Sequence, residues 1–344
     1  MTAGESERTR AGLQQWFEHQ GTDDAVVTVH PGPQATGASH ETILFDVTHN
    51  GRTRPLVARV HPGDDGVFPH PDLSVEYRLL DALSRTDVPL PGLHAFELDP
   101  SWLGAPFYVM DRVDGVVAGD SPPYTMMGWL YEATPDERAH VWFAGLEAMA
   151  RVHAVDASRL AFVNRGRPLG LEGEIAYWGD YANFVGAELV GCARRAWDWL
   201  IANHPDSTDV ALCWGDSRLG NQLFANNRCV ALLDWEMAAI SDPVQDLAWF
   251  AYFDDVFTDG IGVPRLEGIP SQQETIARYE AATQRPVANF EWFYVFAAYR
   301  FVAIMQRIGL LMIRDGRLPP DSPFPVENFS TVHLDRVCEE KGIP

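Results

Sequence analysis

The sequence ALCWGDSRLGNQLFANNRCVALLDWEMAAISDPVQDLAWF, residues 211–250, decides how the rest of the chain is interpreted. Between its short apolar runs stand three polar residues that a packed core would normally exclude: Asp216, Asn221 and Asp234. Taken singly, each is better explained by local structure: Asp216 and Asn221 as turn residues and Asp234 as the cap of the next helix. Their combination at this spacing indicates a functional site.

The local pattern predicts a β-hairpin that joins these three residues. Residues 211–214 and 230–233 are apolar runs typical of strands, and residues 222–225 form a further short run. The dipeptide Asn226-Asn227 favours a tight turn between the second and third of these runs. We therefore expect Asp216 and Asn221 at the start of the hairpin and Asp234 at its end.

The spacing Asp-x-x-x-x-Asn fits the catalytic loop of a phosphotransferase, where the Asp accepts the proton of the acceptor hydroxyl and the Asn holds Mg²⁺. Because Mg²⁺ prefers oxygen ligands together with nucleotide phosphates, an Asp at the end of the following strand suits a second ligand. The pattern predicts Asp216 as the base, with Asn221 and Asp234 as magnesium ligands. Arg218 lies inside the loop, where it could neutralise Asp216, meet the transferred phosphate or be a plain surface arginine.

These motifs resemble those of the aminoglycoside phosphotransferase and choline kinase family, which are small-molecule kinases with a protein-kinase-like fold. The resemblance rests on three segments: Trp214-Gly215-Asp216 with Asn221, Leu233-Asp234-Trp235-Glu236, and Asp242-Pro243-x-x-Asp246-Leu247-Ala248. The family pattern has His where this chain has Trp214. The resemblance implies ATP as phosphoryl donor, Mg²⁺ as cofactor and the hydroxyl of a small molecule as acceptor. It also makes Asp246 a structural acceptor of loop N–H groups, Asp242 a helix cap and His153 a packing residue that matches a family position.

The expected fold class is α+β, a two-lobe protein-kinase-like fold. Residues 1–112 are expected to form a small antiparallel-sheet lobe with one helix, at residues 72–84, after a leading amphipathic helix at residues 5–20. Residues 113–344 are expected to form a larger, mainly helical lobe. The helices predicted there cover residues 135–153, most of 173–203, 243–252, 271–283, 289–314 and 331–341.

Lysine usage narrows the choice of phosphate-binding residue, because Lys341 is the only lysine in the chain. A Walker A loop is therefore excluded, and any interior phosphate contact must come from arginine. Arg59, in the extended run 57–60, takes the place of the strand lysine of kinases, and a branch of the resembled family uses Arg there. Glu76 on the following helix is the expected partner of Arg59. The alternative for Arg59 is a strand side chain that faces solvent, and the alternative for Glu76 is a position on an exposed helix face.

The resemblance also implies nucleotide contacts elsewhere in the first lobe. The stretch from Gly37 to Thr42 resembles the loop that covers the nucleotide, with Gly37, Ser39, His40 and Thr42 as its contacts; an ordinary hairpin loop is the alternative. Residues 104–115 resemble the hinge between lobes, where backbone groups near Met110 and Arg112 would meet adenine. A plain strand and turn would have the same letters.

Composition excludes several classes of function. The formal net charge of −22 argues against nucleic acid or an anionic membrane as partner, and no run of about 18 apolar residues indicates a membrane span. The first eight residues lack the apolar core of an export signal, and four cysteines without C-x-x-C spacing are typical of reduced thiols. We expect a cytoplasmic protein, monomeric or homodimeric.

The acceptor is left open by the sequence. Acids in the helical lobe could bind an amine such as an aminoglycoside, namely Asp180, Glu188, Asp254, Asp255 and Glu291. The abundant Trp, Tyr and Phe there suit an acyl acceptor or simply a core, and the branch with Arg includes kinases of hydroxyacyl thioesters. Two alternatives to a kinase remain: a nucleotide-binding pseudokinase with a regulatory or scaffolding role, and a hydrolase, since residues 215–220 nearly spell G-x-S-x-G but have Leu219 at the fifth position.

Overall fold

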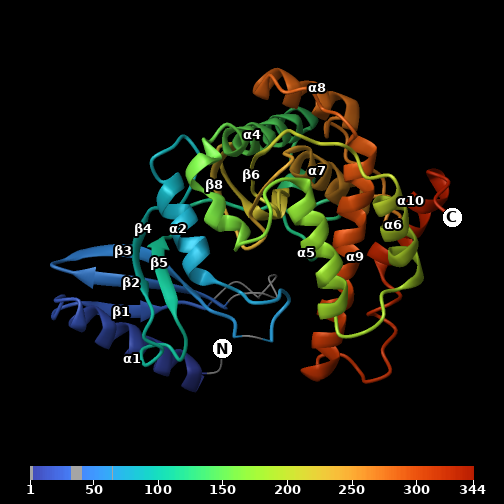
Figure 1. Ribbon diagram of the computed structural model, residues 1–344. Helices are drawn as coiled ribbons and strands as arrows, with labels where there is room; N and C mark the ends of the chain where they lie inside the picture. The colour runs from blue at the N-terminus through green and yellow to red at the C-terminus, as the bar shows by residue number, and fades with distance from the viewer. Residues whose placement is uncertain (1–2, 32–40, 64) are drawn as a thin grey trace. The chain divides into compact units, whose positions relative to one another are not determined.

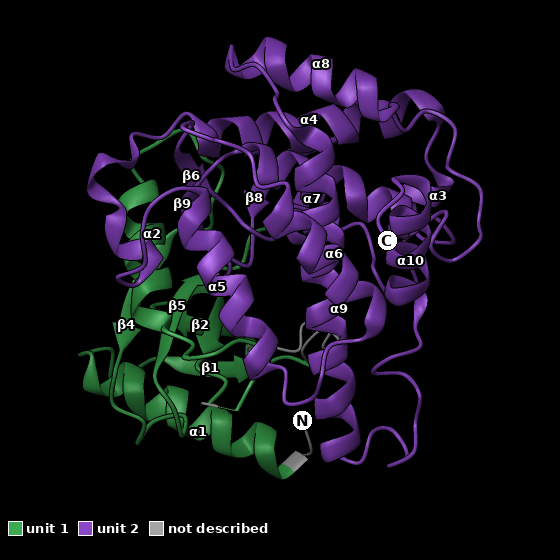
Figure 2. Ribbon diagram, turned by 45° about the vertical axis from the view of Figure 1, so that its right-hand side comes forward, with its two compact units in different colours: residues 1–114 green, residues 115–344 purple. Residues whose placement is uncertain are grey.

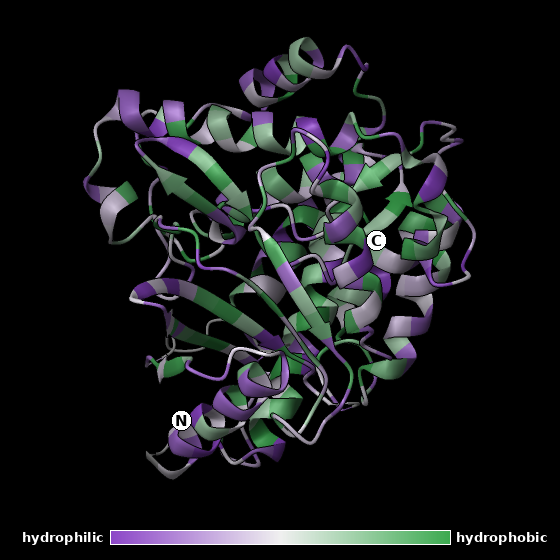
Figure 3. Ribbon diagram, turned by 90° about the vertical axis from the view of Figure 1, so that its left-hand side faces the viewer, coloured by the Kyte–Doolittle hydropathy of each residue, from purple (hydrophilic) through white to green (hydrophobic). Residues whose placement is uncertain are grey.

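The computed structural model describes residues 3–31, 41–63 and 65–344. The chain divides into two compact units, Met1–Asp114 and Gly115–Pro344, shown in green and purple in Figure 2. Figure 1 labels the elements of each unit. In Figure 3, hydrophobic stretches of the strands and helices are interrupted by hydrophilic ones, as expected for elements that bury one side.

Unit 1 is built on a five-stranded antiparallel sheet in the order β1-β2-β3-β5-β4. The strands are β1 (Val26–Val29), β2 (Glu41–His49), β3 (Arg52–Val60), β4 (Leu93–Glu97) and β5 (Phe107–Asp111). The turn between β2 and β3 uses Asn50 and Gly51, both at positive φ, as the Asn-Gly signal predicts. Two helices accompany the sheet: α1 (Ala3–His19) and α2 (Leu73–Leu83).

The core of unit 1 lies between α1 and one face of the sheet. Leu13 and Trp16 of α1 are buried against alternate residues of the strands, among them Phe45, Ala58 and Val109. Because strand side chains alternate between faces, the intervening residues point to the opposite face. That alternation places Arg59 and Tyr108 together on the second face, on the side where the buried Glu76 of α2 meets Tyr108.

Unit 2 is mainly helical and holds two small antiparallel sheets. The strands are β6 (Ala211–Cys213) paired with β9 (Ala239–Ser241), and β7 (Gln222–Ala225) paired with β8 (Arg228–Leu232). The α-helices are α3 (Trp129–Glu132), α4 (Pro135–His153), α5 (Leu171–Phe184), α6 (Gly191–Ala202), α7 (Val244–Val256), α8 (Gln272–Thr283), α9 (Phe290–Arg314) and α10 (Phe329–Glu340). Short 3₁₀ turns are η1 (Ala157–Arg159), η2 (Ala161–Asn164) and η3 (Leu219–Asn221).

The starts of the main helices follow from local capping chemistry. Thr134 and Glu137 form a capping box at α4, with Pro135 in the first turn, and Ser271 and Glu274 do the same at α8. Each box pairs a cap side chain with otherwise unpaired backbone N–H groups of the first turn. The sequence therefore marks where these helices begin.

Helix α9 forms the centre of unit 2, packed against α7, α6 and α10. It is the one helix among the described residues that is long and apolar enough to cross a membrane, although 67% of that stretch is buried inside the protein. Its burial is that of a core helix, because Tyr299 stacks on Trp197 of α6 and the indole of Trp292 donates to the carbonyl of Leu200 in the same helix. Glu291, Arg300 and Arg307 interrupt α9, so it meets the criterion for a membrane span by its average composition and contains no unbroken run of about 18 apolar residues.

The structure confirms the predicted fold class, with an antiparallel sheet in unit 1 and a mainly helical unit 2. Three details differ. The leading helix α1 packs on the sheet and contributes Leu13 and Trp16 to the core of unit 1, whereas the lobe was expected to contain one helix, at residues 72–84. The long helical segment 173–203 is broken at residues 185–190. Strand β9 was not predicted, since three residues carry too little periodicity to be recognised.

Candidate active site

The carboxylate of Asp216 is held by three donors, two from its own loop and one from α7. Its Oδ1 accepts from Nε of Arg218 at 2.9 Å and from the indole Nε1 of Trp249 at 2.8 Å. Its Oδ2 accepts from Nδ2 of Asn221 at 2.7 Å. A carboxylate with donors on both oxygens has a fixed orientation, which is what a group that must meet a substrate proton requires.

The predicted β-hairpin is present and brings Asn221 next to Asp234. Strands β7 and β8 pair with Gln222 opposite Leu232, and the backbone N–H of Leu233 donates to the carbonyl of Asn221 at 2.9 Å. Asp234 follows directly, at a φ of 61°. The amide Nδ2 of Asn221 also donates to the backbone carbonyl of Asp216 at 3.1 Å, so its Oδ1 is turned away from Asp216.

Asn221 and Asp234 therefore offer an amide oxygen and a carboxylate from opposite ends of one hairpin. These are the ligands that a hard divalent cation takes, and Mg²⁺ needs only one or two protein carboxylates because water and phosphates complete its shell. Among the described residues there is no group of three or more His, Cys, Asp and Glu side chains suited to a metal. The pair fits a cation that shares its ligands with a nucleotide better than a closed, all-protein site.

The carboxylate of Asp246 holds the backbone of the loop that carries Asp216. Its two carboxylate oxygens accept from the N–H groups of Trp214 at 2.6 Å and Gly215 at 2.9 Å, as expected for a structural acceptor. His153, fully buried, bonds to Asp246 through Nε2 at 3.1 Å and to the hydroxyl of Tyr279 through Nδ1 at 2.7 Å. The expected packing role of His153 is therefore one of hydrogen bonding to the residue that holds the loop.

Gly215 occupies a position that other residues would not tolerate. Its φ is +94°, and a Cβ there would lie 2.2 Å from the carbonyl oxygen of Met237. Since the obstacle is backbone, no side-chain rotation relieves it. Asp242 directly follows β9 and was expected to be the N-cap of α7. The N-cap position is Pro243, and Asp242, one residue earlier, accepts from the N–H of Val244 in the first turn at 2.9 Å.

Arg218 is not the surface arginine that was one of its three readings. Its guanidinium lies between Asp216 and Asp120, to which Nη1 forms a short ion pair, and its side chain is 17% exposed. Burial lowers the pKa of Arg218, but the two carboxylates more than offset this and raise it above its ordinary value. Arg218 is therefore a permanent cation that forms ion pairs with both Asp216 and Asp120.

The hydrolase reading loses its nucleophile in the structure. Ser217 is fully buried, and its hydroxyl donates to the backbone carbonyl of Asp246 at 2.8 Å. A nucleophile elbow presents its serine to solvent on a strand-to-helix turn, whereas this loop leads into a hairpin.

Trp214, at the family's His position, is buried and donates from its indole to the carbonyl of Leu233 at 2.9 Å, so it ties the loop to the end of β8.

In unit 1, a row of residues crosses three strands on the face toward α2. Thr42, Arg59 and Tyr108 stand opposite one another on β2, β3 and β5. Arg59 is half-buried and donates from Nη1 to Oγ1 of Thr42 at 3.0 Å. The hydroxyl of Tyr108 donates to Oε1 of Glu76 at 2.8 Å, and Glu76 is only 3% exposed. The exposed-helix reading of Glu76 was therefore wrong, and Tyr108 is the shared neighbour of Arg59 and Glu76.

The other residues expected to contact the nucleotide are Met110 and Arg112 of the hinge and three residues of the covering loop. Met110 is buried on β5, and the side chain of Arg112 pairs with Asp46 at 2.9 Å. The backbone N–H of Arg112 donates to the carbonyl of Pro55 at 3.1 Å, so this amide of the expected hinge has a protein acceptor. Gly37, Ser39 and His40 lie outside the described residues.

Four of the acids considered for an amine acceptor have partners in the fold. Glu188 pairs with Arg194, and Glu291 with Lys341 at 3.2 Å. Buried Asp254 pairs with Arg265 at 2.6 Å, and Asp255 accepts from the hydroxyl of Tyr294 at 2.7 Å. Asp180 is exposed on α5. Asp254 and Asp255 are thus held within the fold, whereas the side chains of Glu188 and Glu291 are 77% and 81% exposed and their ion pairs lie at the surface.

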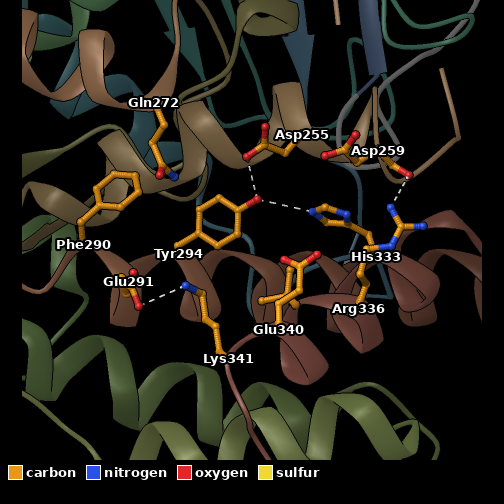
Figure 4. Close-up of a pocket in the computed structure, with 11 residues that line it drawn as sticks. Asp255, Asp259, Gln272, Phe290, Glu291, Tyr294, His333, Arg336, Glu340 and Lys341 are labelled. Atoms are coloured by element: carbon orange, nitrogen blue, oxygen red, sulfur yellow. Dashed lines mark hydrogen bonds and ion pairs between the residues drawn. The ribbon is translucent and has the colours of Figure 1, made fainter. Parts of the chain in front are cut away.

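Asp255 belongs to a cavity of about 230 Å³ at the ends of α7, α9 and α10 (Figure 4). Burial raises the pKa of Asp255 to about 6, partly opposed by the Tyr294 hydrogen bond. Burial lowers the pKa of His333, on the other side of Tyr294, to about 4. The walls of this cavity contain none of Asp216, Asn221 and Asp234, so it is separate from the loop that they form.

Two residues of the loop's surroundings were missed in the sequence. Trp249 lies in an apolar run, and an indole N–H donor there has no signal that distinguishes it from a core tryptophan. Asp120 lies in an irregular segment almost 100 residues before Arg218, its ion-pair partner. The one usable hint was the position of Trp249 three residues after Asp246, which puts both on one side of α7.

Comparisons with known proteins identify the family and the fold of this chain. The model of the phosphotransferase enzyme family (APH) matches residues 33–284. Human acyl-CoA dehydrogenase family member 11 is 27% identical over 247 residues, which are 68% of this chain but only 30% of that protein. A Ralstonia eutropha protein assigned as an aminoglycoside phosphotransferase superposes with a TM-score of 0.69 at 23% identity, covering 96% of this chain and 98% of that one.

A thermostable variant of the aminoglycoside phosphotransferase APH(4)-Ia, solved with ADP and hygromycin B, superposes with a TM-score of 0.54 at 15% identity, covering 95% of this chain and 96% of that one. At these identities the structural likeness establishes the fold alone. The family model, by contrast, spans most of the chain, including the loop with Asp216, Asn221 and Asp234. The chain belongs to the phosphotransferase enzyme family and has the protein-kinase-like fold of the aminoglycoside phosphotransferases.

Proposed function

We propose that this protein catalyses ATP-dependent, magnesium-assisted phosphoryl transfer to a hydroxyl group of a small molecule. The observation that carries the proposal is the convergence on one hairpin of Asp216, held by three donors, with Asn221 and Asp234. Family membership supports phosphotransfer, and the ADP complex of a structural neighbour supports an adenine nucleotide as donor.

In the proposed step, the oxygen of the acceptor hydroxyl forms a bond to the γ-phosphorus of ATP, and the bond between that phosphorus and the leaving ADP oxygen breaks. Asp216 receives the proton of the hydroxyl. Since the transition state of phosphoryl transfer is loose, the base contributes mainly by positioning the hydroxyl. Arg218, Asn221 and Trp249 fix the carboxylate for this task. Arg218 stays charged throughout, because Asp120 and Asp216 flank it.

Asn221 and Asp234 are the residues that would hold Mg²⁺, which when bound neutralises phosphate charge and orients the transferred group. On the nucleotide side, Arg59 is the proposed phosphate contact, since a guanidinium can replace the usual lysine. Thr42 positions one of its nitrogens, and Tyr108 links it to Glu76. Gly37, Ser39, His40, Met110 and Arg112 remain proposed nucleotide contacts.

The acceptor proposed first for testing is a hydroxyacyl thioester. The matched human relative is named for acyl-CoA dehydrogenation, which places a segment like this one in a protein named for acyl-thioester chemistry. Of the five acids considered for an amine, buried Asp254 is paired with Arg265 and Asp255 is bonded to Tyr294. Amino sugars and amino alcohols are the comparison acceptors.

The test separates binding from turnover in matched variants. Asp234→Asn should abolish Mg²⁺-dependent ATP binding measured by calorimetry. Asp216→Asn should leave ATP binding intact and remove both transfer and slow ATP hydrolysis. Asp198→Asn, an exposed acid on α6, is the control and should behave as wild type.

If wild type binds Mg²⁺ and ATP but transfers phosphate to no thioester, alcohol or amino sugar, and hydrolyses none, the scaffolding pseudokinase replaces the kinase. If ATP binding is absent, or survives unchanged in Asp234→Asn, the assignment of this hairpin is wrong.

A further inference from the structure

Arg300 is a buried arginine at the centre of unit 2. It lies on α9 and is 1% exposed. Within the part of the chain that the structure describes, its Nε and Nη1 have no hydrogen-bond partner, and its Nη2 makes one hydrogen bond. A buried cation with so few partners is expensive, because apolar residues of similar size usually fill a core better. Its presence therefore indicates a role that packing alone does not explain.

The one hydrogen bond of Arg300 goes to the loop that carries Asp216. Its Nη2 donates to the carbonyl of Gly215 at 3.1 Å. The N–H of Gly215 is held at the same time by Asp246 at 2.9 Å. Gly215 is thus fixed on both of its backbone polar groups, and its carbonyl belongs to the peptide that leads directly into Asp216.

Arg300 also contacts the side chain that orients the carboxylate. Its guanidinium carbon lies 4.4 Å from the ring centroid of Trp249 and 4.8 Å from that of Trp178, with Phe296 at 5.5 Å. A cation over an indole face is attracted to it, most strongly in a desolvated site. Trp249 in turn donates to Asp216 at 2.8 Å, so Arg300 reaches Asp216 through the backbone of Gly215 and through the ring of Trp249.

Charge supports the same role. Burial lowers the pKa of Arg300, while the carboxylates of Glu174, Asp246 and Asp216 act in the opposite direction. An arginine remains protonated even so. These three carboxylates, from α5, α7 and the loop, therefore lie near one buried cation, and none of them forms a direct ion pair with it among the described contacts.

We propose that Arg300 is a positioning residue for the catalytic loop, which sets the place of Asp216 by holding the carbonyl of Gly215 and the ring of Trp249. This inference rests on the proposed phosphotransferase activity. Arg300 does not touch the substrate, so its loss should lower kcat and leave the KM for ATP unchanged.

The first experiment replaces the guanidinium while keeping side-chain length. Arg300→Met removes charge and donor and should lower kcat on the order of 100-fold, the loss expected when a catalytic group shifts by about 1 Å. Arg300→Lys keeps a donor without the planar stacking and should lose less. Arg307→Met is the matched control, since Arg307 lies on the same helix and stacks on Phe184 at 4.5 Å, and it should keep wild-type kcat.

The second experiment asks for chemical rescue. Arg300→Ala leaves a space between the indoles of Trp178 and Trp249 that matches a free guanidinium ion. Millimolar guanidinium chloride should restore part of kcat with saturation, and the same concentration of ammonium chloride should not. A general packing defect would respond to neither salt, and that result would overturn the proposal.

Hydrogen exchange gives a readout that does not require turnover. Peptides covering residues 213–224 should exchange faster in Arg300→Met than in wild type, with unchanged exchange in α4. Wild type without activity would refute the proposed function while this readout still decides the role of Arg300. Equal loop exchange in the two proteins, a raised KM with unchanged kcat, or faster exchange throughout unit 2 would refute the positioning role.

Discussion

The indole Nε1 of Trp249 donates a hydrogen bond to Oδ1 of Asp216 at 2.8 Å. Trp249 is 1% exposed and belongs to α7, the same helix whose first turn carries Asp246. Helix α7 therefore holds the loop at two places. Asp246 accepts from the loop's backbone N–H groups, and Trp249 donates to the carboxylate of Asp216. The aromatic density of this unit thus has a specific use beside its packing.

Replacing Trp249 by Phe should lower kcat about 10- to 100-fold, because a hydrogen bond to a charged group contributes about 1.5–3 kcal/mol. ATP binding should be retained, since Asn221 and Asp234 are unchanged. Steady-state kinetics checks this. Trp142→Phe is the control: Trp142 is equally buried and donates to Oγ1 of Thr275 at 2.9 Å, away from the loop. Equal losses in both variants would show that only indole packing matters.

Gly215→Ala should destabilise the protein and abolish turnover, because the new Cβ would meet the carbonyl oxygen of Met237 at 2.2 Å and push Asp216 out of place. Gly316→Ala separates strain from collision: its φ is +70°, but no atom lies within 4 Å of a Cβ there. That variant should lose about 1–2 kcal/mol of unfolding free energy and keep its activity. Denaturant unfolding and turnover measure the two effects. An active Gly215→Ala enzyme would contradict the expectation.

Glu76→Gln should weaken ATP binding about tenfold, through loss of a charge that we expect to hold Arg59 beside Tyr108. The fold should persist, because glutamine still accepts from the Tyr108 hydroxyl. Calorimetric titration with ATP tests this. Glu97→Gln is the control. Glu97 lies in the same unit and accepts from the indole of Trp16 at 2.9 Å, but it has no expected contact with the nucleotide. ATP affinity unchanged in Glu76→Gln would remove Glu76 from the nucleotide site.

Asp255→Asn should stabilise the protein at pH 8 and have little effect near pH 4. Burial raises the pKa of Asp255 to about 6 in the fold, above an unfolded value of 3.8. The folded state then binds the proton more tightly, so wild type loses stability as pH rises from about 4 to 6, by at most about 3 kcal/mol. Asp254 and Asp259 reinforce the raised pKa, while Tyr294 and Arg265 oppose it.

Thermal melts of wild type and Asp255→Asn between pH 4.5 and 8 measure this difference. Asp315→Asn is the control of opposite sign, because hydrogen bonding to Arg314 lowers the pKa of Asp315, and its contribution to stability is lost as pH falls. A difference between wild type and Asp255→Asn that stays constant with pH would refute the prediction.

The hairpin and its three polar residues could be predicted because the signals are local. Apolar runs, the Asn226-Asn227 turn and the spacing of Asp216 to Asn221 lie within about twenty residues, and the structure pairs β7 with β8 as expected. Helix starts were equally accessible, since the capping boxes at Thr134 and Ser271 involve residues three apart. Turn chemistry and capping depend on neighbours in sequence, so a single sequence contains them.

The residues that surround the Asp216 loop could not be predicted from the sequence in the same way. Arg300, Trp249 and Asp120 come from α9, α7 and an irregular segment, and each looks in the sequence like a core or surface residue of its own element. Their roles depend on contacts with residues tens of positions away in the sequence, which exist only after the elements of unit 2 have packed together. The sequence by itself determined the fold class and which residues could carry the chemistry. Only the tertiary structure decided which distant side chains hold them, because burial turns an ordinary arginine or tryptophan into a directed donor.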